Sequence, residues 1–298
     1  MNGWIILDKP VGPGSTQAVS AVKRALRDAG APKRKVGHGG TLDPLASGVL
    51  PVAIGEATKL AGRMLDSDKI YDFTIGFGVE TDTLDLEGKP VAQSDERPTQ
   101  DALAAVLARF TGPIEQVPPA YSALKVEGAR AYDLARAGEE VALATRSVTV
   151  HALDLASSTE AGGPLESATL TAHVSKGTYI RSLARDIARA LGTVGHVTML
   201  RRVKAGPFGL DQAISLDKLA DAAKERRLET VLLPLRAGLD DIPALSLTPG
   251  QAGQLRAGQH VTGATADDGL VFAMLDEVPV ALAEVQAGMI RVVRGFNL

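Results

Sequence analysis

The sequence contains no cysteine, which excludes disulfide bonds and thiolate metal ligands in this chain of 298 residues. It also has no apolar run near the roughly 20 residues that a membrane-spanning helix needs. The amino-terminal segment MNGWIILDKP lacks the basic start and the long apolar stretch of a secretory signal. These absences predict a protein of the reducing cytoplasm that has no membrane partner.

A large excess of one charge is also missing, because the net charge is only −3. A nucleic-acid-binding protein of this composition must therefore gather its positive charge locally. Three basic groups are present: Lys23 to Lys35, the helix-spaced Arg181, Arg185 and Arg189, and the segment with Arg201, Arg202 and Lys204. One basic run is usually a solvated surface. Three runs beside glycine-rich segments favour a surface for a polyanion.

The apolar fraction of 45% and the charged fraction of 22% are those of a globular protein, and the length permits one large core or two domains. Apolar spacing predicts strands at residues 3–10, 69–83 and 146–158, helices at 15–30 and 99–112, and a further strand followed by a helix within 166–192. A boundary is expected near residues 235–239, where the helical pattern stops. Short strands with glycine turns and one short helix follow it.

Asp43 stands in an unusual segment, GHGGTLDPLASGVL. An aspartate followed by Pro44 and an apolar stripe is typical of a helix start, with Asp43 as its cap. That interpretation leaves the adjacent glycines unexplained, because two glycines cost backbone entropy and indicate a close approach or a positive φ. An aspartate on such a tight segment beside His38 also suits a nucleophile in a ligand cleft. The segment alone leaves both interpretations open.

Six segments resemble, in order, the blocks of the bacterial tRNA pseudouridine synthase B family. They are LDKPVGPGST, KVGHGGTLDPLASGVLPVAIGEATK, KIYDFTIGFGVETDTLDLEG, VPPAYSALKVEGARAYDLARAG, SKGTYIRSLARDIA and GHVTMLRRVKAGPF. The first block departs from many relatives, which read closer to G-x-T-S where this chain has GPGST. The resemblance implies an isomerase that converts uridine-55 in the TΨC arm of tRNA to pseudouridine.

The resemblance also implies the fold. We expect an α+β protein with a mixed, mostly antiparallel sheet and flanking helices. Residues 1–236 would form the catalytic domain, with a thumb-like insertion at about 118–140 that closes over the RNA. Residues 237–298 resemble a small PUA-like RNA-binding domain only loosely.

Particular positions match the functional residues of the family. Asp43 matches the essential aspartate, Arg181 the arginine that pairs with it, and Tyr71 the tyrosine that packs on the target uracil. The expected substrate-binding residues are His38, which fills the space of the flipped base, Tyr179, Leu200 and Lys59. The expected RNA-backbone contacts are Lys33, Arg34, Lys35, Arg201, Arg202 and Lys204. Whether Tyr71 removes a proton stays open. The route of the aspartate also stays open: it could attack the sugar at C1′, attack the base at C6, or allow a glycal to form.

The chemistry of this reaction fits the composition. Pseudouridylation breaks the N1–C1′ bond and joins C5 to C1′, so no electrons are lost and no atoms are added. We therefore expect no cofactor and no metal, and the sequence has no paired-histidine ligand motif. The base must leave its stack, and a dry pocket disfavours an ionised carboxylate. A buried guanidinium at Arg181 would oppose that cost.

Plainer interpretations remain for single residues and for the whole chain. Tyr71 alone is typical of a core tyrosine, Arg181 of a basic helix face or a partner of Asp186, and His38 of a turn. The chain could also be an RNA-binding protein with an inactive site, or a relative that uses a guide RNA. A glycosidase is less favoured, because no second acid near Asp43 is suggested. The short end after the terminal domain favours a stand-alone monomer without an obligatory protein partner.

Overall fold

The computed structural model describes all residues except 123–124, 127–128, 131–142 and 159–162. Its main sheet has the strand order β14-β1-β3-β12-β4-β11-β10-β7, with β13 beside β12 and β2 beside β3. The strands are β1 (Gly3–Lys9), β2 (Val36–His38), β3 (Ala46–Ile54), β4 (Lys69–Phe77), β7 (Gly112–Gln116), β10 (Arg146–Ser158), β11 (Ser167–Val174), β12 (Gly195–Ala205), β13 (Phe208–Gly209) and β14 (Leu233–Pro234). Its pairs are antiparallel except β12 with β3, which confirms the predicted mixed, mostly antiparallel sheet.

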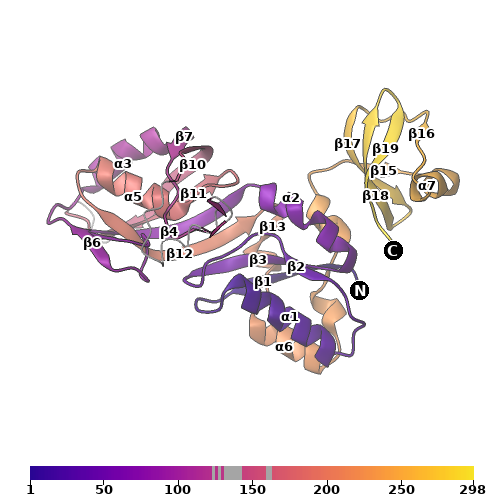
Figure 1. Ribbon diagram of the computed structural model, residues 1–298, viewed down its shortest axis with the longest axis horizontal. Coiled ribbons are helices and arrows are strands. Elements are labelled where there is room, and N and C mark those ends of the chain that lie inside the picture. Colours follow the sequence, from indigo (N-terminus) through magenta and orange to yellow (C-terminus); the bar gives the residue numbers. More distant parts are fainter. Residues whose placement is uncertain (123–124, 127–128, 131–142, 159–162) are drawn as a thin grey trace.

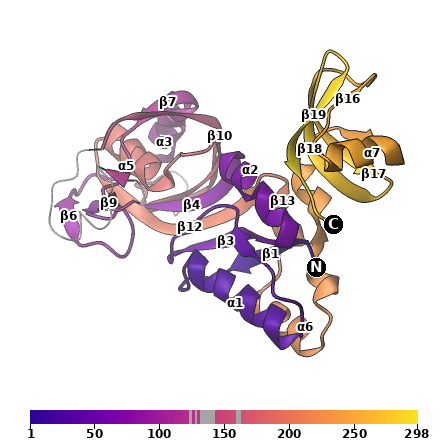
Figure 2. The same cartoon turned by 45° about the vertical axis from the view of Figure 1, so that its right-hand side comes forward.

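Helices cover the two halves of this sheet (Figures 1 and 2). On one half, α1 (Ser15–Asp28) and α6 (Leu216–Lys224) pack with β1 and β3 in one hydrophobic cluster. On the other half, α3 (Gln100–Leu107) and α5 (Ile180–Ala190) pack with β4, β10 and β11 in a second cluster. Tyr71 and Leu200 contact both clusters, so they mark the border between the halves. No helix in the described ranges is long and apolar enough to cross a membrane.

Several short elements connect the larger ones. They are η1 (Gly55–Leu60), α2 (Ala61–Asp66), β5 (Val79–Thr81), β6 (Pro90–Gln93), η2 (Ala108–Phe110), β8 (Lys125–Val126), β9 (Ala129–Arg130), η3 (Leu210–Gln212), η4 (Leu228–Val231) and η5 (Leu235–Leu239). The pairs β5–β6 and β8–β9 are separate two-stranded sheets.

The segment after Asp43 is not a helix, so the cap interpretation is wrong. A turn follows Asp43, and β3 begins at Ala46 and pairs with β1 and β12. Sheet pairing therefore overrides the local helix-start pattern. Gly48 lies in this strand with φ of +104°, and a Cβ there would lie 2.1 Å from the backbone oxygen of Arg202. Gly48 thus serves close backbone approach, and Gly40 has a positive φ of +135°.

Replacing Gly48 by alanine is expected to lower the free energy of unfolding by about 3–5 kcal/mol, because a methyl group there meets backbone and the φ is unfavourable. Urea unfolding followed by circular dichroism measures this change. The matched control is Gly62→Ala in α2, where a Cβ meets no atom within 4 Å. That variant should gain about 0.5–1 kcal/mol from helix propensity. Equal stability of the two variants would contradict the close approach at Gly48.

A second sheet follows in the carboxy-terminal part. It has the order β15-β17-β18-β19-β16 and carries the helix α7 (Pro249–Arg256). Its strands are β15 (Ala244–Ser246), β16 (Val261–Thr262), β17 (Gly269–Leu275), β18 (Val278–Gln286) and β19 (Met289–Gly295). This sheet has a hydrophobic cluster of its own, and Phe272 and Phe296 share a further cluster with Trp4 and Leu239. The predicted boundary at residue 236 falls within η5, whose Leu235 and Leu239 are buried in that shared cluster.

Candidate active site

Asp43 lies in the loop between β2 and β3, and the amino-terminal segment holds this loop. The hydroxyl of Ser15 donates to the carbonyl of Leu42 and accepts from its N–H, at 2.9 and 2.8 Å. The N–H of Gly12 donates to the carbonyl of Pro44 at 2.8 Å. The residues on both sides of Asp43 are therefore fixed, and the first sequence block acts as an anchor of the loop.

Lys9 adds a buried cation beneath the same loop, and the sequence reasoning missed it. Its Nζ donates to the carbonyls of Pro10 and Pro13 at 2.8 Å each and lies 3.5 Å from that of Pro44. Burial lowers the pKa of Lys9, while the negative charge of Asp43 opposes this change. The lysine thus ties the first sequence block to the aspartate loop.

Arg202 holds the loop from the other side. Its guanidinium donates to the carbonyls of Gly40, Thr41 and Val49 at 3.1, 3.2 and 2.8 Å, and the residue is 1% exposed. The prediction that Arg202 contacts the RNA backbone is therefore wrong. Neighbouring residues of a strand point to opposite faces, so Arg202 faces inward beside the more exposed Arg201.

Arg181 stands in the first turn of α5 and bridges two carboxylates. Its Nη2 lies 3.2 Å from Oδ2 of Asp43, and its Nη1 lies 3.3 Å from Oδ2 of Asp85. It also donates to the carbonyls of Thr83 and Tyr121, both at 2.9 Å. The Arg181 side chain is 10% exposed and that of Asp43 is 49% exposed. The guanidinium is thus a fixed, buried cation, and the carboxylate of Asp43 remains open to solvent.

Asp85 is the residue that sequence reasoning missed most clearly. Its side chain is 12% exposed, and it accepts from the hydroxyl of Thr83 at 2.5 Å and the N–H of Glu87 at 3.0 Å. The expectation of no second acid near Asp43 is wrong. Its only sequence signal is its place in the block KIYDFTIGFGVETDTLDLEG. Because the Asp85 carboxylate is held by Thr83 and Glu87, it fixes the position of the Arg181 guanidinium.

A hollow opens beside this pair of carboxylates. Arg181, Asp43 and Asp85 line it together with Thr198 and an apolar wall of Leu45, Ala46, Val197, Met199 and Leu200. Leu200 therefore lies where the sequence places it, on the apolar wall. The half-exposed Asp43 shows that the expected dry pocket is not closed in the protein alone.

Tyr71 lies at the border of the two sheet halves, and Tyr179 lies at the start of α5. Tyr71 is partly buried on β4 and packs against both clusters beside Leu200. Tyr179 precedes α5, and its backbone N–H and carbonyl bond to the side-chain amide of Gln116 at 2.8 and 3.1 Å. Burial raises the pKa of the Tyr179 hydroxyl, so this phenol stays neutral. Within the described residues, neither tyrosine lines the hollow itself.

His38 ends β2 and accepts a hydrogen bond at Nδ1 from the N–H of Gly40, at 3.4 Å. Burial, and next the charge of Arg202, lower the pKa of His38. The imidazole is therefore held in its neutral form. Like the tyrosines, it stands outside the lining of the hollow as far as the described chain shows.

The structure does not bring Lys59, a predicted substrate-binding residue, to the loop of Asp43. Lys59 lies in η1, beyond the end of β3 that is remote from Asp43. Its Nζ pairs with Glu56 at 2.6 Å and donates to the carbonyl of Gly295 at 2.8 Å. The lysine thus connects the main sheet to the carboxy-terminal strand β19.

The remaining basic candidates differ in their exposure. Lys33, Arg34, Lys35 and Lys204 are exposed, as phosphate contact requires. Arg201 instead forms a two-point ion pair with Asp8, at 3.0 and 2.8 Å. The predicted thumb at 118–140 falls largely outside the described residues, and its described part includes the Tyr121 carbonyl bound to Arg181.

Comparison with known proteins identifies the family. Residues 27–180 match the model of the TruB family pseudouridylate synthase (N terminal domain), and residues 181–240 match the tRNA pseudouridylate synthase B C-terminal domain. The tRNA pseudouridine synthase B of Novosphingobium aromaticivorans is 66% identical over 298 residues, which cover 100% of this chain and 98% of the relative. That of Zymomonas mobilis is 60% identical, with 100% and 96% covered.

Solved structures are similar over nearly the whole chain. An H/ACA RNP bound to a substrate RNA containing 2'-deoxyuridine holds a chain that is 25% identical, with a TM-score of 0.74 and coverage of 99% of this chain and 85% of that one. A Cbf5-Nop10-Gar1 complex holds one that is 26% identical, with the same TM-score and coverage. The fold, the loop that presents Asp43 and these matches agree: the chain belongs to the TruB family of tRNA pseudouridylate synthases, which confirms the family, fold class and enzyme class predicted from the sequence.

Proposed function

We propose that this chain isomerises uridine-55 in the TΨC arm of tRNA to pseudouridine, with Asp43 as the reacting carboxylate. The observation that carries the proposal is the ion pair of Asp43 with the buried Arg181 at the edge of a hollow with an apolar wall. Family membership supports the reaction, and the relatives compared above are named tRNA pseudouridine synthase B.

Arg181 keeps the carboxylate of Asp43 ionised and oriented when RNA binds. A nucleotide that enters the hollow displaces water from Asp43, and loss of water disfavours the charged form of a carboxylate. The guanidinium at 3.2 Å opposes this effect, and its bonds to Asp85 and to two backbone carbonyls keep it in place. Its planar fork also fixes the direction of the carboxylate, which a lysine ammonium does not do.

The flipped uridine would lie between Asp43 and the apolar wall. Taking a base out of its stack costs a few kcal/mol, and contacts to side-chain rings return about 1–3 kcal/mol per base. We assign the ring contacts to Tyr71, at the border of the two sheet halves, and to Tyr179, before α5, and an apolar contact to Leu200 on the wall of the hollow. The N1–C1′ bond breaks, the base turns, C5 joins C1′, and the proton lost from C5 is balanced by one gained at N1.

His38 has a separate proposed role on the RNA. Its lowered pKa favours a neutral imidazole, and a neutral ring stacks on bases without the cost of removing a charge from water. We assign it to the space that the uridine leaves in the arm. Its loop is held by Arg202 through the carbonyl of Gly40.

The exposed basic loop of Lys33, Arg34 and Lys35 is proposed to bind phosphates of the arm. Replacing all three by alanine should weaken tRNA binding and reduce the slope of log K against log salt by about 2 to 3, since each phosphate contact contributes about 0.7 to 0.9. Filter binding at several salt concentrations measures this slope. The control is Lys224→Ala on α6, an exposed lysine beside Asp221. An unchanged slope in the triple variant would exclude this loop as a phosphate contact.

We further propose that the chain works as a cytoplasmic monomer without an obligatory protein partner. Residues 1–236 would be the catalytic domain, and residues 237–298 a PUA-like RNA-binding domain. The separate core of the carboxy-terminal sheet supports this division. Sedimentation of the active protein with and without tRNA checks the proposed stoichiometry of one chain per tRNA.

Incubation of the purified chain with an unmodified tRNA transcript tests the proposed function. Pseudouridine should form at uridine-55, without any other protein or guide RNA, and none should form in a transcript with cytidine at that position. Chemical mapping at nucleotide resolution measures both. Modification only after a guide RNA is added, or at another uridine, would overturn the proposal.

A further inference from the structure

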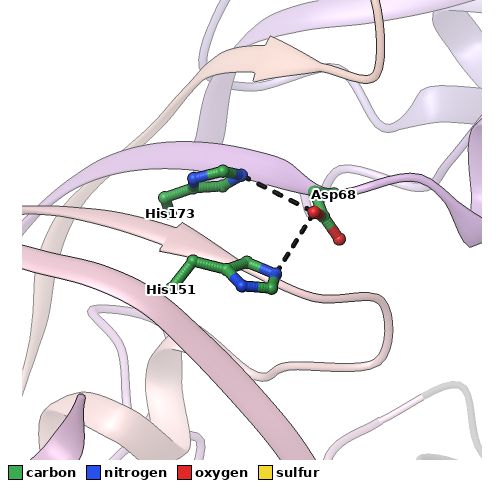
Figure 3. Close-up of side chains that lie close together, drawn as sticks. All are labelled: Asp68, His151 and His173. Atoms are coloured by element: carbon green, nitrogen blue, oxygen red, sulfur yellow. Dashed lines mark ion pairs between the residues drawn. The ribbon is translucent and has the colours of Figure 1, made fainter. Parts of the chain in front are cut away.

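Two histidines and an aspartate converge at a place that the proposed reaction does not use. His151 on β10 and His173 on β11 both direct Nε2 toward the same oxygen, Oδ2 of Asp68, at 3.2 and 3.7 Å (Figure 3). One ligand atom from each of the three residues lies within 4.8 Å of the others. Asp68 directly precedes β4, so the cluster joins three neighbouring strands.

The backbone places these side chains on one face by a β-bulge. The pairing of β10 with β11 is shifted between Val150 and Ala152. Val150 and Leu153 are both buried, so His151 and Ala152 both point away from the core. Bulges of this kind redirect a side chain and are frequent beside sites. His173 alternates with buried neighbours on β11 and points to the same outer face.

We propose that Asp68, His151 and His173 form a binding site for Zn²⁺. Imidazole nitrogen and carboxylate oxygen are ordinary zinc ligands, and three such ligands plus water complete a tetrahedral ion. Zinc bonds of about 2.0–2.2 Å require ligand atoms about 3.3 Å apart. The two histidine nitrogens lie 3.2 and 3.7 Å from Oδ2 of Asp68, and all three ligand atoms lie within 4.8 Å of one another. The side chains are 37–49% exposed, so small rotations and a water ligand are accommodated.

The surrounding charges leave the carboxylate available to a cation. Within the described residues, neither a lysine nor an arginine forms an ion pair with Asp68. The adjacent Lys69 donates its Nζ to the backbone carbonyls of Met64, Leu65 and Ser67 instead. Lys176 pairs with Asp66, at 3.0 Å. The histidine rings are therefore the groups that face Asp68.

The position of the site suggests a bracing role. Zinc there would join β4, β11 and β10, which are adjacent in the sheet. On β4, Tyr71 pairs with Ala172, next to His173, and packs toward the opposite, core-facing side. The ion would thus stiffen the strands behind Tyr71 without reaching the hollow. The sequence gives no hint of it, because the three ligands stand far apart in the chain and form no motif.

Zinc titration of the tag-free, chelator-treated full chain tests the site independently of isomerase activity. Calorimetry should show one Zn²⁺ bound per chain, and His151→Asn or His173→Asn should weaken binding at least about tenfold. Zinc should also raise the midpoint of thermal unfolding of the wild-type chain, because a ligand stabilises the state that binds it. The matched control is His260→Asn, which changes an exposed histidine of the carboxy-terminal part.

The double variant His151→Asn/His173→Asn separates a metal site from a simple ion pair. It should lose both zinc binding and the zinc-dependent rise in the unfolding midpoint, while circular dichroism verifies its fold. Equal zinc uptake by the wild-type chain and the double variant would overturn the proposal. So would the absence of stoichiometric binding to the wild-type chain, since the histidines would then only pair with Asp68.

Discussion

Replacing Arg181 by methionine is expected to reduce the single-turnover rate of isomerisation by at least about 10²–10³-fold, the effect of losing a fixed charge-stabilising donor in an active site. The same change should lower the free energy of unfolding by about 3–5 kcal/mol, because Asp85 would remain buried without its cation. Arg181 contacts two carboxylates and two backbone carbonyls at 2.9–3.3 Å. Arg181→Lys keeps the positive charge but loses the forked guanidinium, so its rate should fall between those of the wild-type chain and Arg181→Met.

Arg189→Lys provides the matched control on the same helix. Arg189 also pairs with a carboxylate, Glu80, but its side chain is 56% exposed. The Glu80 side chain is 9% exposed, but a lysine keeps a positive charge beside it and loses only one of the two hydrogen bonds. This variant should therefore lose only about 0.5–1.5 kcal/mol of stability and keep its rate within about twofold. Urea unfolding and single-turnover assays give both values. If Arg181→Met and Arg189→Lys behaved alike, the bridging role of Arg181 would be wrong.

Local pattern was sufficient for the main elements. The helix expected at 15–30 is α1 (Ser15–Asp28), and the strand expected from Lys69 is β4 (Lys69–Phe77). These segments carry regular apolar spacing, because each buries one face, α1 in one hydrophobic cluster and β4 in the other. The helix expected at 99–112 begins where predicted, since the side chain of Thr99 caps it.

Sequence reasoning was wrong where distant segments decide the local structure. The turn at Asp43 leads into a strand because β1 and β12 offer pairing partners that no local pattern reveals. Arg201 and Arg202 are neighbours in the sequence, but their side chains lie on opposite faces of β12. Only the burial of Arg202 in the folded chain shows that this residue holds a loop. Asp85 joins the site because Arg181 reaches it from another element. Charge and spacing in one segment do not contain this information.

Replacing Asp43 by asparagine is expected to lower the single-turnover rate by at least about 10⁴-fold, the scale for loss of a reacting group. The amide keeps the shape of the side chain but cannot act as an anionic nucleophile or base. Because the Asp43 side chain is 49% exposed, the fold should persist, and tRNA affinity should remain within severalfold. Thermal unfolding and filter binding provide these two controls.

Asp85→Asn is the variant to compare with Asp43→Asn, because both carboxylates contact Arg181 and only Asp43 is proposed to react. Asp85 is 12% exposed and occupied by neighbouring donors, so the amide should destabilise the site without removing the reacting group. We expect Asp85→Asn to form pseudouridine slowly and to reach completion given time.

The most direct measurement is therefore the yield of pseudouridine at uridine-55 from excess Asp43→Asn and excess Asp85→Asn protein, each saturated with the same transcript. The account predicts no product from the first variant and full conversion at a reduced rate from the second. Product from Asp43→Asn, or an inactive Asp85→Asn protein that still folds and binds tRNA, would contradict it.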